Sequence, residues 1–276
     1  MSLENSRQEV TTQAKGVLGP TAAARKFRLA RFKPAADLMS FVEYFWIVAW
    51  DLRGQEPHVQ KTLPHPCVHL VFDRGKTAIF GVMRGAFEYR QTEERRALGV
   101  RFRPGGFRGL LGAPLTSITD RTIPISAVYG STSDAAAEAA VLDADGDEGM
   151  MQAAESLLRT RIPPLDHNVD FVHSVVECVA TDRTITRVDV LAKTLGWGER
   201  ALQRLFSDYV GVSPKWVIRR SRLHDAASRL AAEEDVNLTH LAQDLGYSDQ
   251  AHFTRDFKAI VGRSPSDYRR SEKTEG

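Results

Sequence analysis

The sequence has few cysteines and no long apolar segment. Its two cysteines, Cys67 and Cys178, lie in different parts of a 276-residue chain, so we expect no disulfide framework and favour a reducing cytoplasm. The longest apolar stretch, near residues 45–50, is far shorter than the roughly 20 residues that span a membrane. Residues 1–24 are polar and lack the apolar segment of a secretory signal. A membrane partner is therefore not expected.

Recognisable catalytic patterns are also missing. No Gly-rich phosphate loop, Ser-His-Asp set or pair of carboxylates stands out, so we expect no catalytic residues, no enzymatic activity and no cofactor. The composition, 42% hydrophobic and 26% charged, suits a globular protein, and 276 residues are enough for two domains with separate cores.

The net charge of +2 is small but unevenly distributed. Residues 1–124 contain 19 Lys and Arg against 11 Asp and Glu, residues 125–182 contain 2 against 11, and residues 183–276 contain 16 against 13. The acidic middle segment is a poor surface for nucleic acid. The small basic excess of the last segment does not by itself indicate DNA binding, because non-specific affinity needs clustered basic residues.

After the polar tail of residues 1–24, residues 25–130 are predicted to form a β-rich domain. Short apolar or alternating segments recur about every ten residues between Pro, Gly and charged breaks, as is typical of an antiparallel sandwich or small barrel. One helix is expected after Pro34, where apolar residues have helical spacing at Leu38, Phe41, Val42 and Phe45. The expected strands are Lys26–Phe32, Cys67–Asp73, Thr77–Val82, Ala86–Arg90 and Leu98–Arg103.

Residues 131–182 are predicted to be an acidic helical connector. Asp134–Leu142 and Asp147–Leu158 form two expected helices, and Pro163-Pro164 ends the second of them. A third helix is capped by Asp166 and carries a broad apolar face up to Val179. This helix could pack on the β-rich domain, link the domains or form a dimer seam.

Residues 183–272 contain an internal repeat and are predicted to be all-α. The pattern Leu-Ala-x-x-Leu-Gly-aromatic occurs at Leu191–Trp197 and again at Leu241–Tyr247, 50 residues later. Six further positions match at an offset of 51, so the second copy has one extra residue. These pairs are Leu202 with Phe253, Arg204 with Arg255, Phe206 with Phe257, Gly211 with Gly262, Ser213 with Ser264, and Pro214 with Pro265.

Each copy is predicted to be a helix, a tight turn and a second helix. Gly196 and Gly246 stand where a helix ends in the left-handed conformation that glycine adopts without steric cost. Ser248 is expected to cap the next helix of the second copy, and Gly198 takes that place, as a weaker cap, in the first. Two matched copies joined by a long helix that starts at Pro214 favour a pair of helix-turn-helix units over an ordinary helical bundle.

The exposed faces of the two second helices carry side chains that suit base recognition. Arg donates two hydrogen bonds to guanine O6 and N7, and Gln pairs with adenine N6 and N7. The joining helix is long enough to separate the two recognition helices by roughly 34 Å, one turn of DNA, so that one chain enters successive major grooves.

At this point the sequence resembles the AraC/XylS family of bacterial transcriptional regulators, over about residues 184–270. The resemblance rests on Gly211-x-Ser213-Pro214, Arg222-Leu223, Gly246-Tyr247-Ser248-Asp249-Gln250-x-x-Phe253-x-Arg255-x-Phe257-Lys258 and Gly262-x-Ser264-Pro265-x-x-Tyr268-Arg269. It implies double-stranded DNA as the partner, with RNA polymerase and a second copy of the chain as further candidate partners. The residues that it implies to contact DNA are Arg200, Gln203, Arg204, Gln250, Ala251, His252, Thr254 and Arg255.

The N-terminal part resembles a recurring, uncharacterised sensor-like domain that precedes such DNA-binding ends. The residues that carry this resemblance are Trp46, Leu63-Pro64-His65-Pro66, His69-Leu70-Val71-Phe72, Gly81, Gly99–Phe107 and Thr119-Asp120-Arg121. By analogy with the family, a cupin-like β barrel is implied for this domain.

A small-molecule effector is expected to bind this sensor-like domain, because small barrels enclose cavities of ligand size. Filling of the barrel by its own aromatic side chains remains an alternative, as do a purely dimerising and a catalytic N-terminal domain. Arginines near Pro104 could hold an anionic effector, or could simply face solvent. The candidate effector-binding residues are Trp46, Trp50, Phe72, Phe102, Arg101 and Arg103.

Three histidines lie close together in the sequence and are candidate metal ligands: His58, His65 and His69. The usual metal pattern of cupins is His-x-His with a following Glu, whereas this chain has Cys67-Val68-His69. We therefore predict no metal site and interpret these histidines as ordinary buried or turn residues. Cys67 is interpreted in the same way as a small strand residue, because no neighbouring cysteine supports a reactive or zinc-binding role.

Overall fold

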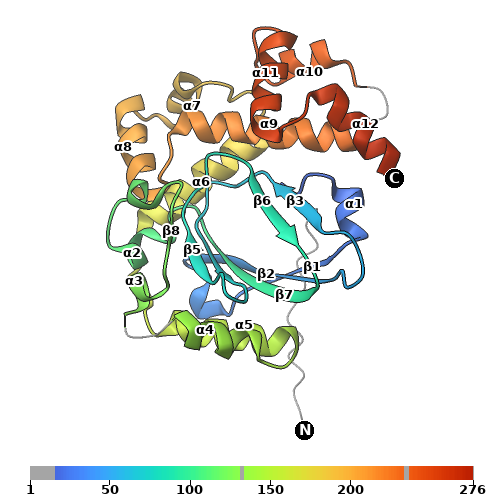
Figure 1. The fold of residues 1–276 in the computed structure, drawn as a ribbon. Helices are drawn as coiled ribbons and strands as arrows, with labels where there is room; N and C mark the ends of the chain where they lie inside the picture. The colour runs from blue at the N-terminus through green and yellow to red at the C-terminus, as the bar shows by residue number, and fades with distance from the viewer. Residues whose placement is uncertain (1–15, 131–133, 233–235, 276) are drawn as a thin grey trace.

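The structure is a computed structural model that describes residues 16–130, 134–232 and 236–275 (Figure 1). A β-rich N-terminal region is followed by helices that pack on both sides of it. Most of the polar tail predicted for residues 1–24 lies outside the described residues, and its described end contains the short helix α1 (Pro20–Ala24). None of the described helices is both long and apolar enough to cross a membrane.

The N-terminal region contains two antiparallel sheets. Among the described residues the two sheets do not join into one closed barrel. The six-stranded sheet has the order β1 (Arg28–Phe32), β2 (Val42–Asp51), β7 (Glu94–Phe102), β4 (His69–Phe72), β5 (Ala78–Phe80) and β8 (Thr122–Ile123). The second sheet pairs β3 (His58–Thr62) with β6 (Phe87–Gln91). Each of the five expected strands is present with shifted ends, as β1, β4, β5, β6 and β7, and β7 begins four residues earlier than expected. The strands β2, β3 and β8 were not expected.

The helix predicted after Pro34 is wrong. Only the 3-10 turn η1 (Ala36–Leu38) forms there, and the ten-residue strand β2 follows. The pairing of β2 with β7 shifts register between Val42 and Tyr44, as at a β-bulge. The shift places Val42 and Phe45, three residues apart, in the same core. A bulged strand therefore produced the spacing that we had interpreted as helical.

One face of the six-stranded sheet packs against α4 (Asp134–Leu142) and α5 (Gly146–Arg159), which lie below the sheet in Figure 1. These helices confirm the two segments predicted at the start of the connector. Phe45 and Leu98 of the sheet share one buried core with Met150 of α5. Burial of this apolar surface is the main force that holds the two helices on the sheet.

The helix α6 (His167–Thr181) packs on the other side of the molecule. Asp166 caps it, as predicted, by accepting a hydrogen bond from the backbone of Asn168 at 2.9 Å. The apolar face of α6 is buried with residues of the C-terminal helices, among them Phe206. The three roles left open for this helix did not include this packing on the C-terminal helices. The helix also contacts the β-rich region, through the ion pair between Arg103 and Asp170.

The second face of the six-stranded sheet is covered by the β3–β6 sheet. The rings of Trp50 and Tyr89 lie 5.8 Å apart across the two sheets, and those of Phe80 and Phe87 lie 5.9 Å apart. Tyr89 also donates a hydrogen bond to Asp73 at 2.7 Å. We call this face, which lies between the two sheets, the inner face.

Candidate nucleic-acid interface and N-terminal site

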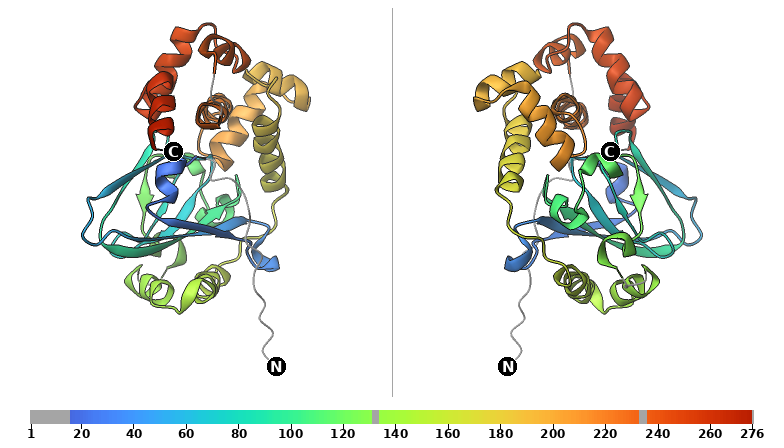
Figure 2. Two further views of the ribbon diagram at one scale, coloured as in Figure 1. Left: turned by 90° about the vertical axis from the view of Figure 1, so that its right-hand side faces the viewer. Right: turned by 90° about the vertical axis from the view of Figure 1, so that its left-hand side faces the viewer.

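In the described residues of the C-terminal region, the helices α7 to α12 form two similar units joined by a long central helix. Figure 2 shows these helices, in gold to red, on one side of the sheets. Each unit is a helix-turn-helix, and each has its own buried core. The first unit is α7 (Val188–Leu195) and α8 (Glu199–Tyr209); the joining helix is α9 (Pro214–Ala232); the second unit is α10 (Leu238–Asp244) and α11 (Gln250–Val261), followed by α12 (Pro265–Glu275).

Both turn glycines have the left-handed conformation that the sequence predicts. The φ angle is +65° at Gly196 and +76° at Gly246. A Cβ atom at Gly246 would also come within 2.6 Å of the side chain of Thr186, whereas nothing lies within 4 Å of that position at Gly196. The left-handed φ angle therefore favours glycine at both turns. At the second turn, the Thr186 side chain also leaves no room for a Cβ atom.

The prediction that Ser248 caps the second recognition helix is wrong. Asp249 is the cap, and its carboxylate accepts a hydrogen bond from the backbone of His252 at 2.7 Å. Ser248 supports the cap by donating to the other oxygen of Asp249 at 3.1 Å. These hydrogen bonds hold the pKa of Asp249 below its usual range. The sequence offers two adjacent capping residues, and the carboxylate forms the stronger bond at the positive end of the helix.

In the first unit Gly198 takes the cap position without a side-chain hydrogen bond, as predicted. The predicted base-contacting residues of α8, Arg200, Gln203 and Arg204, are all exposed. Leu202 and Phe206 face the core on the opposite side of the helix. The sequence periodicity therefore separates the two faces of α8 correctly.

The predicted residues of α11 lie on its outer side. Gln250, Ala251, His252 and Arg255 are exposed, and Thr254 is half-buried. The side chains at the start of the helix have protein contacts. The Gln250 amide oxygen accepts a hydrogen bond from the Thr239 hydroxyl at 2.8 Å, and His252 Nδ1 lies 3.3 Å from the Ser248 hydroxyl oxygen.

The arginines on the two outer faces are available for an anionic partner. In the described ranges, Arg200, Arg204 and Arg255 have no ion pair. Neighbouring arginines do have carboxylate partners: Arg219 pairs with Asp256 at 2.6 Å, and Arg229 pairs with Asp244 at 3.2 Å. Asp256 and Asp244 are thus occupied by Arg219 and Arg229, and the three outer arginines keep their guanidinium groups for another partner.

Comparison with known proteins agrees with this geometry. Residues 191–271 match a family model described as a helix-turn-helix domain, and residues 30–124 match a domain of unknown function, DUF6597. The chain is 39% identical over 82 residues to the regulatory protein SoxS of Escherichia coli K12, which covers 30% of this chain and 76% of SoxS. The chain belongs to the AraC/XylS family of transcriptional regulators.

Other relatives of this family are more distant or match a different share of the chain. The probable transcription factor PqrA of Proteus vulgaris is 35% identical over 83 residues, 30% of this chain and 67% of PqrA. The transcriptional activator NphR of a Rhodococcus species is 30% identical over 169 residues, 60% of this chain and 47% of NphR. These relatives carry the names of transcription regulators.

Solved structures were also matched. The C-terminal domain of AraT from Geobacillus stearothermophilus aligns with 36% of this chain and 82% of its own, at 24% identity and a TM-score of 0.33. ToxT from Vibrio cholerae aligns with 88% of this chain and 94% of its own, at 11% identity and a TM-score of 0.36.

In the N-terminal region of this AraC/XylS-type regulator, the six candidate effector-binding residues do not form one site. Phe72 and Phe102 are fully buried in the core beneath α4 and α5. Trp46, Trp50 and Arg101 lie on the inner face. Side chains alternate along a strand, so residues that looked equivalent in the sequence point to opposite faces of the sheet.

Trp46 and His69 are neighbours on the inner face. The indole of Trp46 lies across Gly99, where a Cβ atom would come within 1.9 Å of the ring. Its Nε1 donates a hydrogen bond to His69 Nδ1 at 3.3 Å. Burial lowers the pKa of His69 to about 3, so the ring is neutral near pH 7. Because Nδ1 accepts, the single ring proton lies on Nε2.

The arginines of this region have partners within the protein. Arg101 forms an ion pair with Glu43 at 2.9 Å and donates to the Tyr44 hydroxyl at 2.8 Å. Arg103 forms an ion pair with Asp170 of α6 at 2.9 Å. An anionic ligand would have to displace these carboxylates, so the arginines do not form a ready anion site.

The remaining sequence candidates are dispersed. His58 lies 3.3 Å from the amide oxygen of Gln60, and His65 stacks on His224 of α9 with ring centroids 4.4 Å apart. His69 contacts Trp46 instead. No group of three metal-ligating side chains occurs among the described residues. Cys67 is buried, which raises the pKa of its thiol to about 12.

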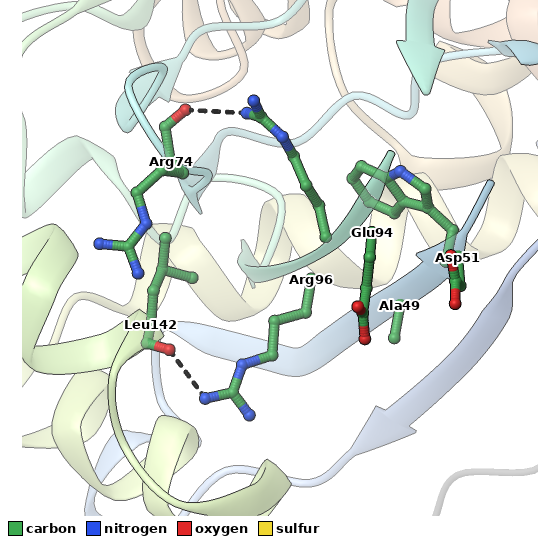
Figure 3. Close-up of a pocket in the computed structure, with 8 residues that line it drawn as sticks. Ala49, Asp51, Arg74, Glu94, Arg96 and Leu142 are labelled. Carbon is green, nitrogen blue, oxygen red and sulfur yellow. Dashed lines mark hydrogen bonds between the residues drawn. The ribbon is translucent and has the colours of Figure 1, made fainter. Parts of the chain in front are cut away.

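An open cleft of about 660 Å³ lies at the edge of β2 and β7, beside the end of α4 (Figure 3). Of the six candidate effector-binding residues, Trp50 alone lines this cleft. Arg96 donates to the backbone oxygen of Leu142 at 2.7 Å, and Arg95 donates to that of Arg74 at 3.4 Å. The cleft is thus lined by side chains that already fasten α4 and the β4–β5 turn to the sheet.

Sequence reasoning missed the contacts that fasten the C-terminal region to the N-terminal region. Thr119 donates to the backbone oxygen of Gly211 at 2.6 Å, and the buried Arg220 of α9 donates to that of Arg84 at 2.5 Å. Arg108 pairs with Asp208 of α8 at 2.6 Å. Several of these residues lie within or beside the motifs of the sensor-like domain. The sequence of these motifs does not indicate which residues they contact in the fold.

Proposed function

We propose that this regulator reads DNA sequence with two recognition helices, α8 and α11, each in its own major groove. The observation that carries the proposal is the matched pair of exposed faces, each with an arginine at the equivalent position, Arg204 and Arg255. Both arginines are on the solvent side of a helix whose opposite side is buried. N-terminal residues of a recognition helix contact base edges, and unpaired arginines donate to guanine or to phosphate.

The test is selection of bound sequences from a random DNA library by the full chain. We expect two conserved clusters of base pairs about ten base pairs apart, because one helical turn separates successive major grooves on one side of DNA. Affinity for the selected site should fall steeply as salt rises, since phosphate contacts release counterions. Recovery of no conserved cluster, or of one cluster alone, would contradict the proposal.

The N-terminal region is proposed to bind a small effector on its inner face. Support comes from the inner-face side chains that remain half-buried instead of packing into a closed core: Tyr44, Trp46, Val48, His69, Val71, Phe80, Phe87 and Tyr89. Their surface is largely apolar and aromatic, as in ligand pockets. The outer core beneath α4 and α5, in contrast, is made of fully buried residues.

The chemistry of the inner face favours an uncharged ligand with a hydrogen-bond acceptor. His69 is neutral and has its proton on Nε2, so it donates. The Tyr44 hydroxyl accepts from Arg101 and keeps its own hydrogen for donation. The positive charge of Arg101 is balanced by Glu43. A carbonyl compound with a flat apolar body satisfies these groups, with Trp46 as the surface on which it lies.

A ligand screen by thermal shift on the full chain tests this assignment. Aromatic carbonyl compounds that raise the melting temperature of the protein should lose that effect in Trp46→Ala, whose ring would be the contact surface. Trp197→Ala is the matched control, because Trp197 is an exposed tryptophan of the first helix-turn-helix turn. If a ligand raises the melting temperature of both variants equally, it does not bind against Trp46.

Modulation of DNA binding would pass through the contacts between the two regions. The Thr119–Gly211, Arg220–Arg84 and Arg108–Asp208 contacts join the N-terminal region to the first helix-turn-helix unit and α9. Leu18 and Leu63 are buried in the core of the second unit. A ligand changes operator affinity only if it binds the DNA-competent state with a different affinity from the free state.

We also propose that the chain is divided as the sequence predicts. It consists of the polar tail 1–24, the sensor-like domain 25–130, the acidic connector 131–182 and the DNA-binding domain 183–272. The core of the sheet supports the sensor-like domain and the cores of the two helix-turn-helix units support the DNA-binding domain, while the connector shares these cores: α4 and α5 belong to the first and α6 to that of the first helix-turn-helix unit. RNA polymerase and a second copy of the chain are proposed partners, and the cytoplasm is the proposed location.

A further inference from the structure

The Thr239–Gln250 hydrogen bond lies at the predicted DNA-contacting surface and joins the two helices of the second unit. Thr239 is in the first turn of α10, where the Asn237 side chain accepts from its backbone nitrogen at 3.0 Å. Gln250 is the first residue of α11. The Thr239 hydroxyl donates to the amide oxygen of Gln250 at 2.8 Å, and both residues are exposed.

This contact changes what the Gln250 amide can recognise. Bidentate pairing with adenine needs the amide oxygen to accept from N6 while the amide nitrogen donates to N7. In the structure the Thr239 hydroxyl occupies one of the two lone pairs of that oxygen, so adenine N6 would have to share the acceptor with Thr239, whereas the amide nitrogen keeps both of its hydrogens for DNA. Donors alone suit the edge of guanine, whose N7 and O6 are both acceptors.

The first helix-turn-helix unit has no equivalent of this pair. At the repeat offset of 50, the position of Thr239 corresponds to Asp189 of α7. Asp189 forms an ion pair with Arg187 at 2.9 Å instead of contacting α8. The effect of Thr239 is therefore confined to the half of the DNA site that faces α11.

We propose that Thr239 sets the base preference of Gln250 by holding its amide oxygen, so that Gln250 favours guanine over adenine. The inference rests on the proposed function, in which Gln250 contacts a base. Thr239 is a positioning residue in this account, because it acts through Gln250 and not by touching the base itself.

The experiment is selection from a random DNA library with four full-length proteins: wild type, Thr239→Val, Thr239→Ser and Gln250→Ala. The Gln250→Ala variant identifies the base pair that Gln250 contacts, because preference is lost there. At that base pair the wild type and Thr239→Ser should select guanine. Valine is close in shape to threonine and cannot donate, so Thr239→Val should raise the adenine-to-guanine ratio by about five-fold or more.

Base preferences in the half-site that faces α8 serve as the internal control. Thr239→Val should leave these preferences unchanged, and an unchanged preference there shows that the variant is folded. If Thr239→Val selects the same base as the wild type where Gln250→Ala loses preference, the inference is overturned and the proposed function stands. If Gln250→Ala changes no base preference, Gln250 does not read a base, and both its assigned role and this inference fail.

Discussion

Thr119 donates its hydroxyl hydrogen to the backbone oxygen of Gly211 across 2.6 Å and thereby joins the N-terminal region to the loop before α9. The adjacent Asp120 binds Arg84, whose backbone oxygen accepts from Arg220 of α9. The Thr119-Asp120-Arg121 motif thus lies at the contact between the two regions. We infer that the first recognition helix takes its position relative to the N-terminal region from this contact.

Replacement of Gly211 tests how tightly the two regions fit together. Its φ angle is +86°, and a Cβ atom would come within 2.8 Å of Thr119 Oγ1 and 2.9 Å of the Leu115 backbone oxygen. We expect Gly211→Ala to lower the free energy of unfolding by about 2–4 kcal/mol, from left-handed strain together with this overlap. Denaturant titration of the full chain measures the change.

Gly196→Ala is the matched control for that substitution. Gly196 has a φ angle of +65°, with nothing within 4 Å of the Cβ position, so the variant carries the backbone strain alone. We expect a loss of about 1 kcal/mol. Equal losses in the two variants would show that the contact with Thr119 and Leu115 does not constrain the C-terminal region.

Gly99→Ala is expected to disrupt the inner face. The added methyl group would overlap the Trp46 ring, which must leave its place across the strand. The expected loss in the free energy of unfolding is about 1–3 kcal/mol, and the fluorescence of the displaced tryptophan should shift to the red. Gly85→Ala is the control, because nothing lies within 4 Å of its Cβ position. A Gly99→Ala protein as stable as the control would refute this packing.

Stability should depend on pH through His69. Burial lowers its pKa to about 3 in the folded protein, below the ordinary value of 6.5. The unfolded chain therefore binds the proton first, and the folded protein loses up to about 1.4 kcal/mol of stability per pH unit as the pH falls from about 6.5 toward 3. Above pH 6.5 this effect is absent.

The comparison that isolates this effect is between the wild type and His69→Gln at pH 7.5 and pH 5. Other titrating groups, including the half-buried His173, are common to both proteins. The stability of the wild type relative to the variant should decrease by about 1–2 kcal/mol at the lower pH. A difference that stays constant with pH would mean that His69 is not held in its neutral form.

The C-terminal region could be predicted closely because its signals are local. The repeat positions the turn glycines and the buried and exposed faces of α8 and α11, which depend on residues three or four apart in one helix. The cap at Asp249 was missed because Ser248 and Asp249 are adjacent and both suit that position. The choice between them depends on one residue of helix register.

The N-terminal region was harder to predict because its arrangement depends on strand pairing. The bulge near Val42 gave a strand the spacing of a helix. The assignment of Phe72 and Phe102 to the same site as Trp46 failed because the sequence does not show which face of each strand is covered by α4 and α5. Contacts such as Thr119–Gly211 join residues 92 positions apart and leave no local pattern.

The central claim, that α8 and α11 each read bases, is tested most directly by the DNA preferences of Arg204→Ala and Arg255→Ala. Each full-length variant is selected against a random library beside the wild type. We predict that each loses preference at a different cluster of base pairs, about one helical turn apart, with about 1–3 kcal/mol of discrimination lost for each bidentate contact. If both variants instead bind every sequence more weakly by the same factor, these arginines contact phosphate, and the claim is wrong.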